Sequence, residues 1–451
     1  MQLFICILLI MLSSFSISAK EHSNQGRVIN EMGNVLSQRQ RIAPINRIVK
    51  NRLDNLLPTL MRESEIDMWL VINREYVEDS LFFTLVPQPT FAARRTTILV
   101  FFDQGEAKGV ERITVSRYPI KDFYESHWEG GTADQQWQKL AEIIAERNPK
   151  KIAINTSKDW PFGDGLTVGL HNQLIKHLPI PYQERLTSAE NLVIRWLETR
   201  TAEELEYYPH IVSIARGVIA EAFSSKVITP GVTSTEDVQW YIRERFESLH
   251  LRPWFHPSVN LQRRGDNVTE NAPFHGRTDV VIQQGDILHT DVGICYLQLC
   301  TDTQEMGYVM KLNEAEVPQG LVEALAKGNQ WQDLLTRQFI TGRTGNEILM
   351  ANLKASKKAG LKVSTYSHPI GFVGHAAGPT IGMWDNQAGT PVKGDWTLNK
   401  NTAYAIEGNI KTKLPEWDNE WIQIKLEQSA FFDGNKVFYL AGRQTQWHLI
   451  R

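Results

Sequence analysis

Hydrophobic and polar positions in the first third of the chain follow two different periods. Between Pro44 and Leu57 an apolar residue returns every three or four positions, which predicts a helix with the proline in its first turn. Pro58 is expected to end or kink this helix. A helical pattern recurs at 135–146, and short apolar runs predict strands at 68–72, 96–102, 113–115 and 151–155. Because strands and helices alternate, the sequence predicts an α/β N-terminal domain.

From residue 190 to residue 250 the apolar spacing is almost entirely helical. Thr201-Ala-Glu-Glu204 and Thr233-Ser-Thr-Glu236 each predict the start of a helix. In such a box the hydroxyl accepts a hydrogen bond from a backbone N–H, and the glutamate reaches back to the N–H of the capping residue. We place the domain boundary just before the first box. The expected division is an N-terminal domain at 36–198 and a C-terminal domain at 199–451.

The C-terminal domain is expected to contain strands, then helices, then strands again. The predicted strands cover residues 286–293, a segment that returns from 299, 402–411 and 421–430, and the predicted helices cover 317–340 and 345–359. Strands and helices that are segregated rather than alternating are typical of an α+β domain. The whole chain is therefore predicted to be α+β, with an α/β domain in front.

Residues 1–19 form an apolar block that ends in the small residues Ser16, Ser18 and Ala19. This pattern predicts a secretory signal peptide, although no Lys or Arg precedes the apolar core. The alternative is a disordered or buried N-terminus. Residues 20–35 are polar and predict a disordered linker. No later stretch is long and apolar enough to span a bilayer, so we expect an exported protein, periplasmic or secreted, with no membrane span after signal cleavage.

Charge and cysteine content argue against two classes of protein. A formal net charge of −3 demands no basic face, so nucleic acid is not expected as a partner. Removal of the signal peptide would leave only Cys295 and Cys300, which is too few for a disulfide scaffold. We expect two buried thiols at these positions, and a disulfide within a hairpin is the alternative.

Acidic and histidine residues mark the predicted strands of the C-terminal domain. Five positions stand out: Asp291, Asp302, His368, Glu407 and Glu427. Three of the acids interrupt apolar strand sequence, and a buried carboxylate is costly unless it is paired or bound to a metal. Four carboxylates and one imidazole suit two divalent cations. An oxygen-rich ligand set favours Mn²⁺ over a thiolate-type zinc site, with Zn, Co or Fe as the other candidates.

The order of these ligands resembles the metallopeptidase family of aminopeptidase P, prolidase and methionine aminopeptidase. The stretch Gly285-Asp-Ile-Leu-His-Thr-Asp-Val-Gly293, followed by Thr301-Asp302, resembles the family segment Gly-Asp-x-x-x-x-Asp-x-Gly and Ser-Asp. The resemblance covers the whole mature chain. It implies a pita-bread catalytic domain preceded by a creatinase/prolidase-type N-terminal domain, in an outlying exported member of the family.

The resemblance also implies a role for each ligand. Asp291 would bind one metal ion, Asp302 and Glu427 would bridge both ions, and His368 and Glu407 would complete the second. A water between the two ions would be the nucleophile, its pKa lowered by two cations. Glu407 could also act as the acid/base that moves the proton of this water.

Two further histidines are expected on the substrate side. The family places a Gly three positions after the ligand histidine and a second histidine seven positions after it, which fits His368, Gly371 and His375. His375 is then the substrate-side residue, and the reversed assignment is the alternative. His275 resembles the first substrate histidine and would bind the scissile carbonyl oxygen or the leaving amine; the alternative is a loop histidine without a catalytic task. His289 is expected to pack beside the ligands.

The sequence departs from the family pattern beside two ligands. The family usually shows Ser-Asp-x-Thr-Arg where this chain has Thr301-Asp-Thr-Gln-Glu305, and often Ile-Arg-Ile-Glu where this chain has Ile424-Lys-Leu-Glu427. Lysine keeps the charge of arginine but not its planar fork. Neither departure removes a ligand. They therefore weaken the expected preference for proline more than the expected hydrolysis.

The function implied is that of a dinuclear metal-dependent exopeptidase that releases the N-terminal residue from Xaa-Pro peptides. Short peptides would be its substrates, and a homo-oligomer is an open possibility. One alternative is a prolidase-type dipeptidase. Others are a creatinase-like enzyme without metals, and a pita-bread protein that cleaves or merely binds peptides without specificity for proline. The complete set of five ligands argues against a metal-free enzyme and against a protein that only binds peptides.

Overall fold

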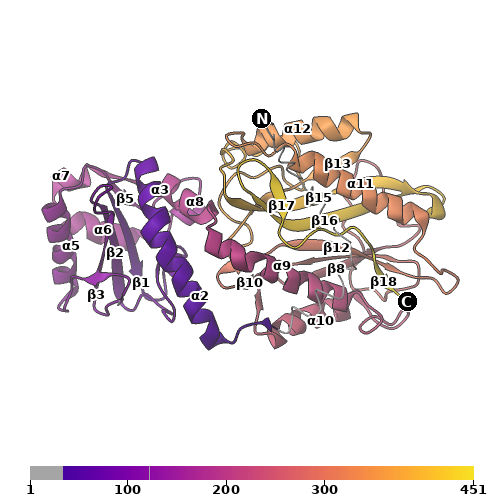
Figure 1. Cartoon of the computed structure of the whole chain (residues 1–451), viewed down its shortest axis with the longest axis horizontal. Helices are drawn as coiled ribbons and strands as arrows, with labels where there is room; N and C mark the ends of the chain where they lie inside the picture. The colour runs from indigo at the N-terminus through magenta and orange to yellow at the C-terminus, as the bar shows by residue number, and fades with distance from the viewer. Residues whose placement is uncertain (1–33, 121) are drawn as a thin grey trace, which may run out of the picture.

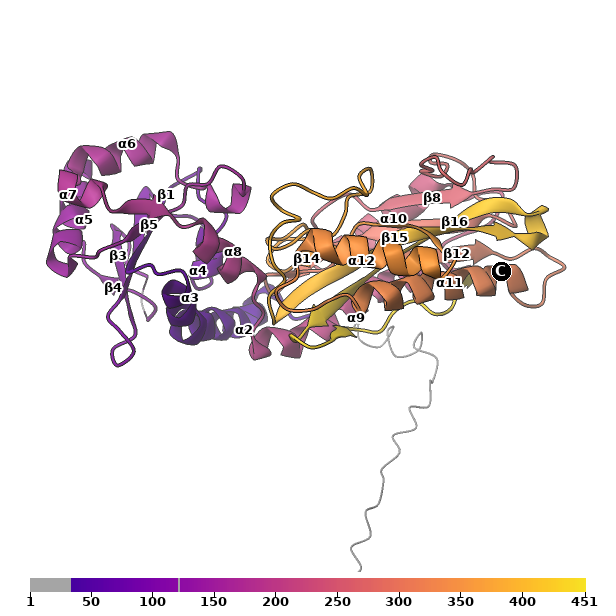
Figure 2. The same cartoon turned by 90° about the horizontal axis from the view of Figure 1, so that it is seen from above.

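The computed structural model describes residues 34–120 and 122–451, which form two lobes (Figure 1). The predicted signal peptide at 1–19 and residues 20–33 of the predicted linker lie outside the described residues. Seen from above, the N-terminal lobe lies at one end of the longer C-terminal lobe (Figure 2). Among the described helices, none combines the length and the apolar content that crossing a membrane requires.

A six-stranded sheet in the order β4-β3-β2-β1-β5-β6 forms the centre of the N-terminal domain. Alternate residues of its central strand face opposite layers: Met68 and Leu70 pack with helices α5 and α6, whereas Trp69 and Val71 pack with α2 and α3. The strands are β1 (Met68–Arg74), β2 (Thr96–Asp103), β3 (Val110–Ser116), β4 (Glu125–Ser126), β5 (Ile152–Ile154) and β6 (Leu186–Ser188). The helices are α2 (Gln38–Asn51), α3 (Leu57–Glu63), α4 (Phe82–Leu85), α5 (Ala133–Arg147), α6 (Val168–His177), α7 (Ile180–Gln183) and α8 (Glu190–Glu198), with a 3₁₀ turn at Pro161–Gly163.

The first helix is longer than the prediction of 44–57. It begins at Gln38, after a capping box between Ser37 and Gln40, and Pro44 lies in its interior. A π-helical segment, Arg52–Leu56, joins α2 directly to α3. Pro58 therefore does not end the helix, because it occupies one of the first two positions of α3, where a missing N–H costs little. The π-helical segment turns Arg52 into the interior.

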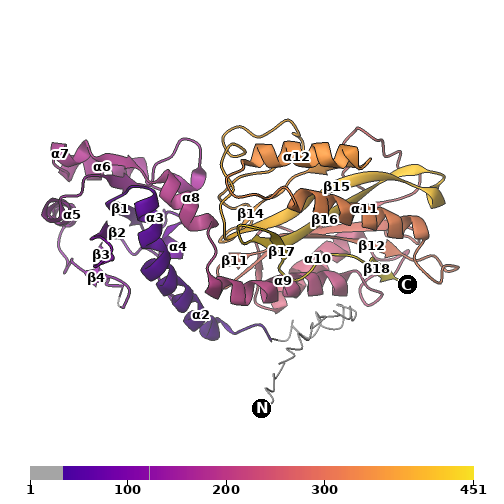
Figure 3. The same ribbon diagram turned by 45° about the horizontal axis from the view of Figure 1, so that its top comes forward.

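A nine-stranded sheet forms the C-terminal domain, and each of two helix pairs packs on its own half of it (Figure 3). Helices α9 and α10 pack near β8 and β9, and α11 and α12 pack near β15 and β16. The central order is β13-β15-β16-β12-β9-β8, while β14 pairs with β15, β17 with β16 and β18 with β12. The helices are α9 (Ala202–Ala222), α10 (Thr235–Ser248), α11 (Gln319–Thr336) and α12 (Gly345–Lys358). The sheet strands are β8 (Ser258–Gln262), β9 (Ile287–Val292), β12 (Thr303–Val309), β13 (Lys362–Thr365), β14 (His368–Ile370), β15 (Thr402–Leu414), β16 (Glu420–Phe432), β17 (Val437–Tyr439) and β18 (His448–Ile450), with a 3₁₀ turn at Pro415–Trp417.

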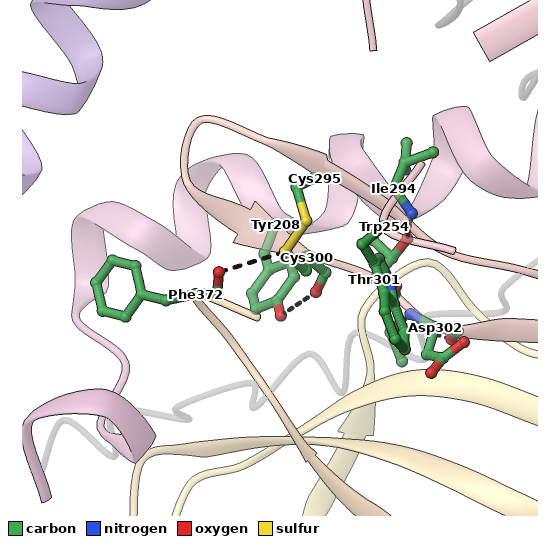
Figure 4. Close-up of a disulfide and its surroundings, with 9 residues drawn as sticks. Tyr208, Trp254, Ile294, Cys295, Cys300, Thr301, Asp302 and Phe372 are labelled. Carbon is green, nitrogen blue, oxygen red and sulfur yellow. Dashed lines mark hydrogen bonds between the residues drawn. A yellow bond between two sulfur atoms is a disulfide. The ribbon is translucent and has the colours of Figure 1, made fainter. Parts of the chain in front are cut away.

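A small separate sheet carries the two cysteines, which form a disulfide (Figure 4). It consists of β7 (Arg252–Pro253), β10 (Ile294–Tyr296) and β11 (Leu299–Cys300). The expectation of two thiols is wrong. Leu297 and Gln298 form a two-residue turn with positive φ angles of 53° and 63°, so that Cys295 and Cys300 pair directly across the hairpin with their Cα atoms 4.0 Å apart.

The two domains meet at a buried group of charges, the junction cluster of Arg52, Arg200 and Glu204. Arg52 donates to both carboxylate oxygens of Glu204, at 3.0 and 3.2 Å, and Arg200 donates to one of them at 3.0 Å. All three side chains are fully buried. The ring of Phe372 lies 4.8 Å from each guanidinium. Since Arg52 belongs to the N-terminal domain and Phe372 follows the predicted metal ligand His368, the junction ties the first domain to a loop of the second.

Candidate metal centre

The five predicted ligands come from five neighbouring segments of the C-terminal sheet. Asp291 lies on β9, Glu427 on β16 and Glu407 on β15, while His368 begins β14 and Asp302 immediately precedes β12. Glu407 and Glu427 are paired directly across their strands. The structure therefore brings together, as the acidic cluster, all five residues that the sequence singled out.

His368 stands at the centre of the acidic cluster. Its Nε2 atom lies 3.6 Å from Asp302 Oδ2, 3.6 Å from Glu407 Oε2 and 3.5 Å from Glu427 Oε1. A separate group of ligand atoms within 4.8 Å of one another comes from Asp291, Asp302 and Glu427. Two ligands bound about 2.0–2.2 Å from one cation lie roughly 3–3.6 Å apart. The spacing around His368 thus suits shared coordination better than direct hydrogen bonds.

Unpaired buried atoms support the same conclusion. Asp291 Oδ1, Asp302 Oδ1, His368 Nε2 and Glu427 Oε1 are buried and have no hydrogen-bond partner among the described residues. Buried polar atoms are normally paired, so several orphans in one place require an explanation. Divalent cations would supply the missing partners, and a set of carboxylate oxygens with one imidazole nitrogen fits a hard or borderline ion.

Burial changes the protonation of the acidic cluster. It raises the pKa of Asp291 to about 7. Burial and the neighbouring carboxylates, Glu427 foremost, hold the pKa of Asp302 well above its usual range. Burial also raises the pKa values of Glu407 and Glu427, and it lowers the pKa of His368 to about 4, which leaves a neutral imidazole suited to ligation. Protons that the acids retain would be displaced when cations bind.

A pocket of about 730 Å³ opens beside the cluster. Asp291 and Glu407 line it, whereas Asp302, His368 and Glu427 lie behind its wall. Trp384, which is 57% exposed, and His275 also line the pocket, with their rings 5.8 Å apart. The pocket has room for a short peptide, with the cluster at its base.

The two substrate-side histidines occupy different places. His375 lies against His368, with ring centres 4.6 Å apart, and burial lowers its pKa to about 4. It also forms a group of possible ligand atoms with Asp302 and His368. The reversed histidine assignment is therefore not removed by geometry, although His368 belongs to two such groups and His375 to one. His275 belongs to none of the groups and lies on the pocket wall.

Gln304 and Tyr366 are among the pocket residues that the sequence did not single out. Each lies two positions from a predicted ligand, Gln304 after Asp302 and Tyr366 before His368. Alternate residues of an extended strand share a face, so this spacing could have identified them. Gln304 donates to two ligands, Glu407 Oε1 at 2.8 Å and Glu427 Oε2 at 2.9 Å.

Comparison with known proteins agrees with the architecture. Residues 208–431 match the profile of metallopeptidase family M24. No protein with a curated description matches the sequence significantly. Among solved structures, an X-Pro aminopeptidase from Thermotoga maritima MSB8 is similar, with a TM-score of 0.61 at 16% identity, over 87% of this chain and 99% of that one.

Two further structures resemble the chain to a similar degree. An Xaa-Pro dipeptidase from Bacillus anthracis has a TM-score of 0.59 at 17% identity, over 91% of this chain and all of that one. The N-terminal domain of the FACT complex subunit SPT16 from Cicer arietinum (chickpea) has a TM-score of 0.52 at 12% identity, over 88% of this chain and 96% of that one. The predicted pita-bread domain with an N-terminal domain in front is thereby confirmed. Residues 208–431, which lie in the C-terminal domain, belong to metallopeptidase family M24.

Proposed function

We propose that the protein is a dinuclear metal-dependent exopeptidase that releases the N-terminal residue from short Xaa-Pro peptides. The observation that carries the proposal is the acidic cluster beside a peptide-sized pocket. Four of its five predicted ligands present a buried atom that has no hydrogen-bond partner among the described residues. Similarity to an X-Pro aminopeptidase and an Xaa-Pro dipeptidase supports the preference for proline. We propose Mn²⁺ as the resident ion, with Zn, Co or Fe as alternatives.

Each residue of the site has a distinct task in this proposal. Asp291, Asp302, His368, Glu407 and Glu427 would hold two divalent cations. When bound, such cations act as Lewis acids that lower the pKa of a water and polarise the scissile carbonyl. Glu407 reaches the pocket and would move the proton of the attacking water to the leaving amine.

The histidines and the tryptophan would position the peptide. His275 and His375 would donate hydrogen bonds to the scissile carbonyl oxygen or contact the leaving nitrogen. Trp384 offers an exposed aromatic face beside His275, against which a proline ring can pack. Proline has no amide N–H, so its recognition depends on such apolar contact more than on hydrogen bonding.

A dipeptidase is the second candidate, and Lys425 favours it. This ammonium lines the pocket, and its nearest hydrogen-bond acceptor is the carbonyl of His275 at 3.5 Å. Among the described residues it forms no ion pair within 4 Å. Burial lowers its pKa to about 8, against the opposing effect of Asp291 and Glu407. A free substrate carboxylate would be a natural partner for this charge.

Turnover assays separate these candidates. An Arg-Pro-Pro tripeptide, an Xaa-Pro dipeptide and an Xaa-Ala control would each be incubated with Mn²⁺ and with a chelator. An aminopeptidase is expected to cleave the tripeptide in the presence of Mn²⁺ but not in the presence of the chelator. A dipeptidase is expected to cleave the dipeptide and not the tripeptide. Cleavage of the Xaa-Ala control alone would refute the preference for proline. A folded protein that takes up no divalent ion would refute the metal centre.

We further propose that the protein is exported. The Cys295–Cys300 disulfide supports export, because disulfides persist in oxidising compartments and are rare in the cytosol. Fractionation of the producing cells, followed by N-terminal sequencing, would test this proposal. A chain that begins near residue 20 in the periplasm or medium is expected, and an unprocessed cytosolic chain would contradict it.

A further inference from the structure

A row of side chains crosses four neighbouring strands at the acidic cluster. In register order it contains Asp291 on β9, Gln304 on β12, Glu427 on β16 and Glu407 on β15. Gln304 is the neutral member of this row and is only 6% exposed. It thus stands directly opposite one predicted ligand on each neighbouring strand, where a side chain without suitable donors would leave the carboxylates unsupported.

The amide of Gln304 selects one oxygen of each glutamate. It donates to Glu407 Oε1 at 2.8 Å and to Glu427 Oε2 at 2.9 Å. The other two oxygens, Glu407 Oε2 and Glu427 Oε1, face His368 Nε2 at 3.6 and 3.5 Å. The oxygens that Gln304 leaves free are therefore the ones that point to the common ligand position.

A chain of hydrogen bonds fixes the orientation of this amide. His289 Nε2 lies 2.8 Å from Gln304 Oε1, and Asn260 Nδ2 lies 3.1 Å from His289 Nδ1. With the proton of the neutral imidazole on Nε2, every donor in the chain points towards the glutamates. A flipped amide would place its oxygen against two carboxylates and its NH₂ group against the N–H of His289. Only one orientation satisfies all the partners.

Two other buried glutamines near Gln304, Gln428 on β16 and Gln332 on helix α11, behave differently. Gln428 donates to the backbone carbonyl of Gln304, and Gln332 donates to the side chain of Gln428. The NH₂ groups of these two side chains therefore donate to a backbone carbonyl and to another glutamine, and not to a predicted metal ligand. Gln304 also replaces the threonine of the usual family pattern, and a hydroxyl has one proton where an amide has two. Only the amide can donate to both glutamates at once.

We infer that Gln304 is a positioning residue that orients Glu407 and Glu427 for cation binding, while His289 and Asn260 hold its amide in the donating orientation. This inference rests on the proposed metal centre. Groups that orient metal ligands by hydrogen bonding typically change metal affinity about 10- to 100-fold when they are removed. The geometry thus assigns a measurable role to a residue that binds no metal itself.

The test is a Mn²⁺ titration of the metal-free protein and its Gln304→Met variant, with the dissociation constant read from calorimetry and from competition with a chelator. Methionine matches the length of glutamine but donates no hydrogen bond. We expect the dissociation constant to rise about 10- to 100-fold, and the Mn²⁺ electron paramagnetic resonance spectrum of the variant to change because the glutamates lose their fixed orientation.

Gln444→Met is the matched control. Gln444 is also buried, and among the described residues its side chain bonds only to the backbone of Met306 and Gln446, so its loss should reduce stability without changing Mn²⁺ affinity. Equal affinity in wild type and Gln304→Met would overturn the inference while the proposed function stands. An equal loss of Mn²⁺ affinity in both variants would show that the effect comes from disturbed packing, and it would also overturn the inference.

A second variant keeps the test decisive if Gln304→Met does not fold. His289→Leu leaves Gln304 in place but removes the group that orients its amide. A several-fold rise in the Mn²⁺ dissociation constant is expected, smaller than for Gln304→Met, and an unchanged constant would contradict the orienting role. Failure of the wild-type protein to bind Mn²⁺, Zn²⁺, Co²⁺ or Fe²⁺ would instead refute the proposed function, and the inference with it.

Discussion

The junction cluster and the acidic cluster bury charge in opposite ways. At the junction, two guanidiniums share one carboxylate, and their remaining N–H groups reach the carbonyls of Thr199, Trp196 and Leu197. The Nε atoms of Arg52 and Arg200 are the exceptions; the other polar side-chain atoms of the junction have hydrogen-bond partners among the described residues. In the acidic cluster, four carboxylates crowd one neutral imidazole, and four ligand atoms have no partner among the described residues.

The difference separates structural charge from functional charge. Burial of an unpaired charge costs several kcal/mol, so a fold keeps such a group only where something else compensates for it. The junction supplies its own compensation and needs no ligand. The acidic cluster lacks it, and cations are the simplest remedy. A group of buried ligand atoms without hydrogen-bond partners among the described residues, rather than buried charge itself, therefore marks the site.

The largest effect on stability is expected from Glu204→Gln at the junction. Without the carboxylate, Arg52 and Arg200 would be buried as two like charges with no counter-charge, which should lower the free energy of unfolding by roughly 3–5 kcal/mol. Urea denaturation followed by tryptophan fluorescence would measure the loss. Glu206→Gln is the control, because Glu206 lies on the same helix but forms only an exposed pair with Arg47. A similar, small effect of both substitutions would show that the junction is not a stabilising unit.

The same chemical change should act in the opposite direction within the acidic cluster. Burial, Glu427 and Asp291 raise the pKa of Asp302, so this carboxyl group must take up a proton when the metal-free protein folds at neutral pH. Asparagine has no such cost, and the metal-free Asp302→Asn variant should therefore be about 1–4 kcal/mol more stable, the range seen when buried ionic groups are replaced by neutral ones. At the same time the variant should lose Mn²⁺ binding and peptide turnover. Denaturation with and without Mn²⁺ measures both. A destabilised metal-free variant would mean that the charges of the cluster are already balanced.

The acidic cluster could be predicted from the sequence, but the junction cluster could not. The ligands were visible because acids stood within apolar strands, and strands are readable from local periodicity. The junction was not visible, because Arg52 and Glu204 are 152 positions apart and each alone resembles an ordinary helical surface residue. Gln304 carries no charge to attract notice. The disulfide was only the alternative prediction, because a hairpin places Cys295 and Cys300 near each other in the sequence but does not show whether two cysteines oxidise or remain buried thiols.

A third, intermediate case is Glu198. Among the described residues its buried carboxylate has one ionic partner, Arg195 at 2.6 Å, and one amide partner, Asn399 at 2.9 Å. Burial outweighs both and raises its pKa to about 7, from a model-compound value of 4.5. Between these values the folded state retains a proton that the unfolded state releases, so stability falls as pH rises from about 4.5 to 7 and is level above that.

Glu198→Gln should remove this fall. Between pH 5 and pH 8 the free energy of unfolding should fall by about 2–3 kcal/mol less in the variant than in the wild type. Urea denaturation at both pH values measures this difference. Groups that titrate in both proteins cancel in the comparison. Glu305 does not interfere, because Arg216 and His448 outweigh its burial and lower its pKa to about 2, below the range tested. Parallel pH profiles would contradict a raised pKa at Glu198.

The smallest effect concerns the hairpin that lies between the two clusters. The N–H of Cys300 donates to the carbonyl of Gly371, and the next residue, Phe372, packs on the junction arginines. Asp302 follows Cys300 by two positions (Figure 4). Replacing both cysteines by serine opens a loop of only a few residues, which should cost about 2 kcal/mol by loss of loop closure. Asp302 remains held by Ser429, at 3.1 Å from its carbonyl oxygen. If the clusters are independent, Mn²⁺ affinity should therefore stay within about twofold of the wild type, whereas a tenfold loss would show that the hairpin couples the domain junction to the metal centre.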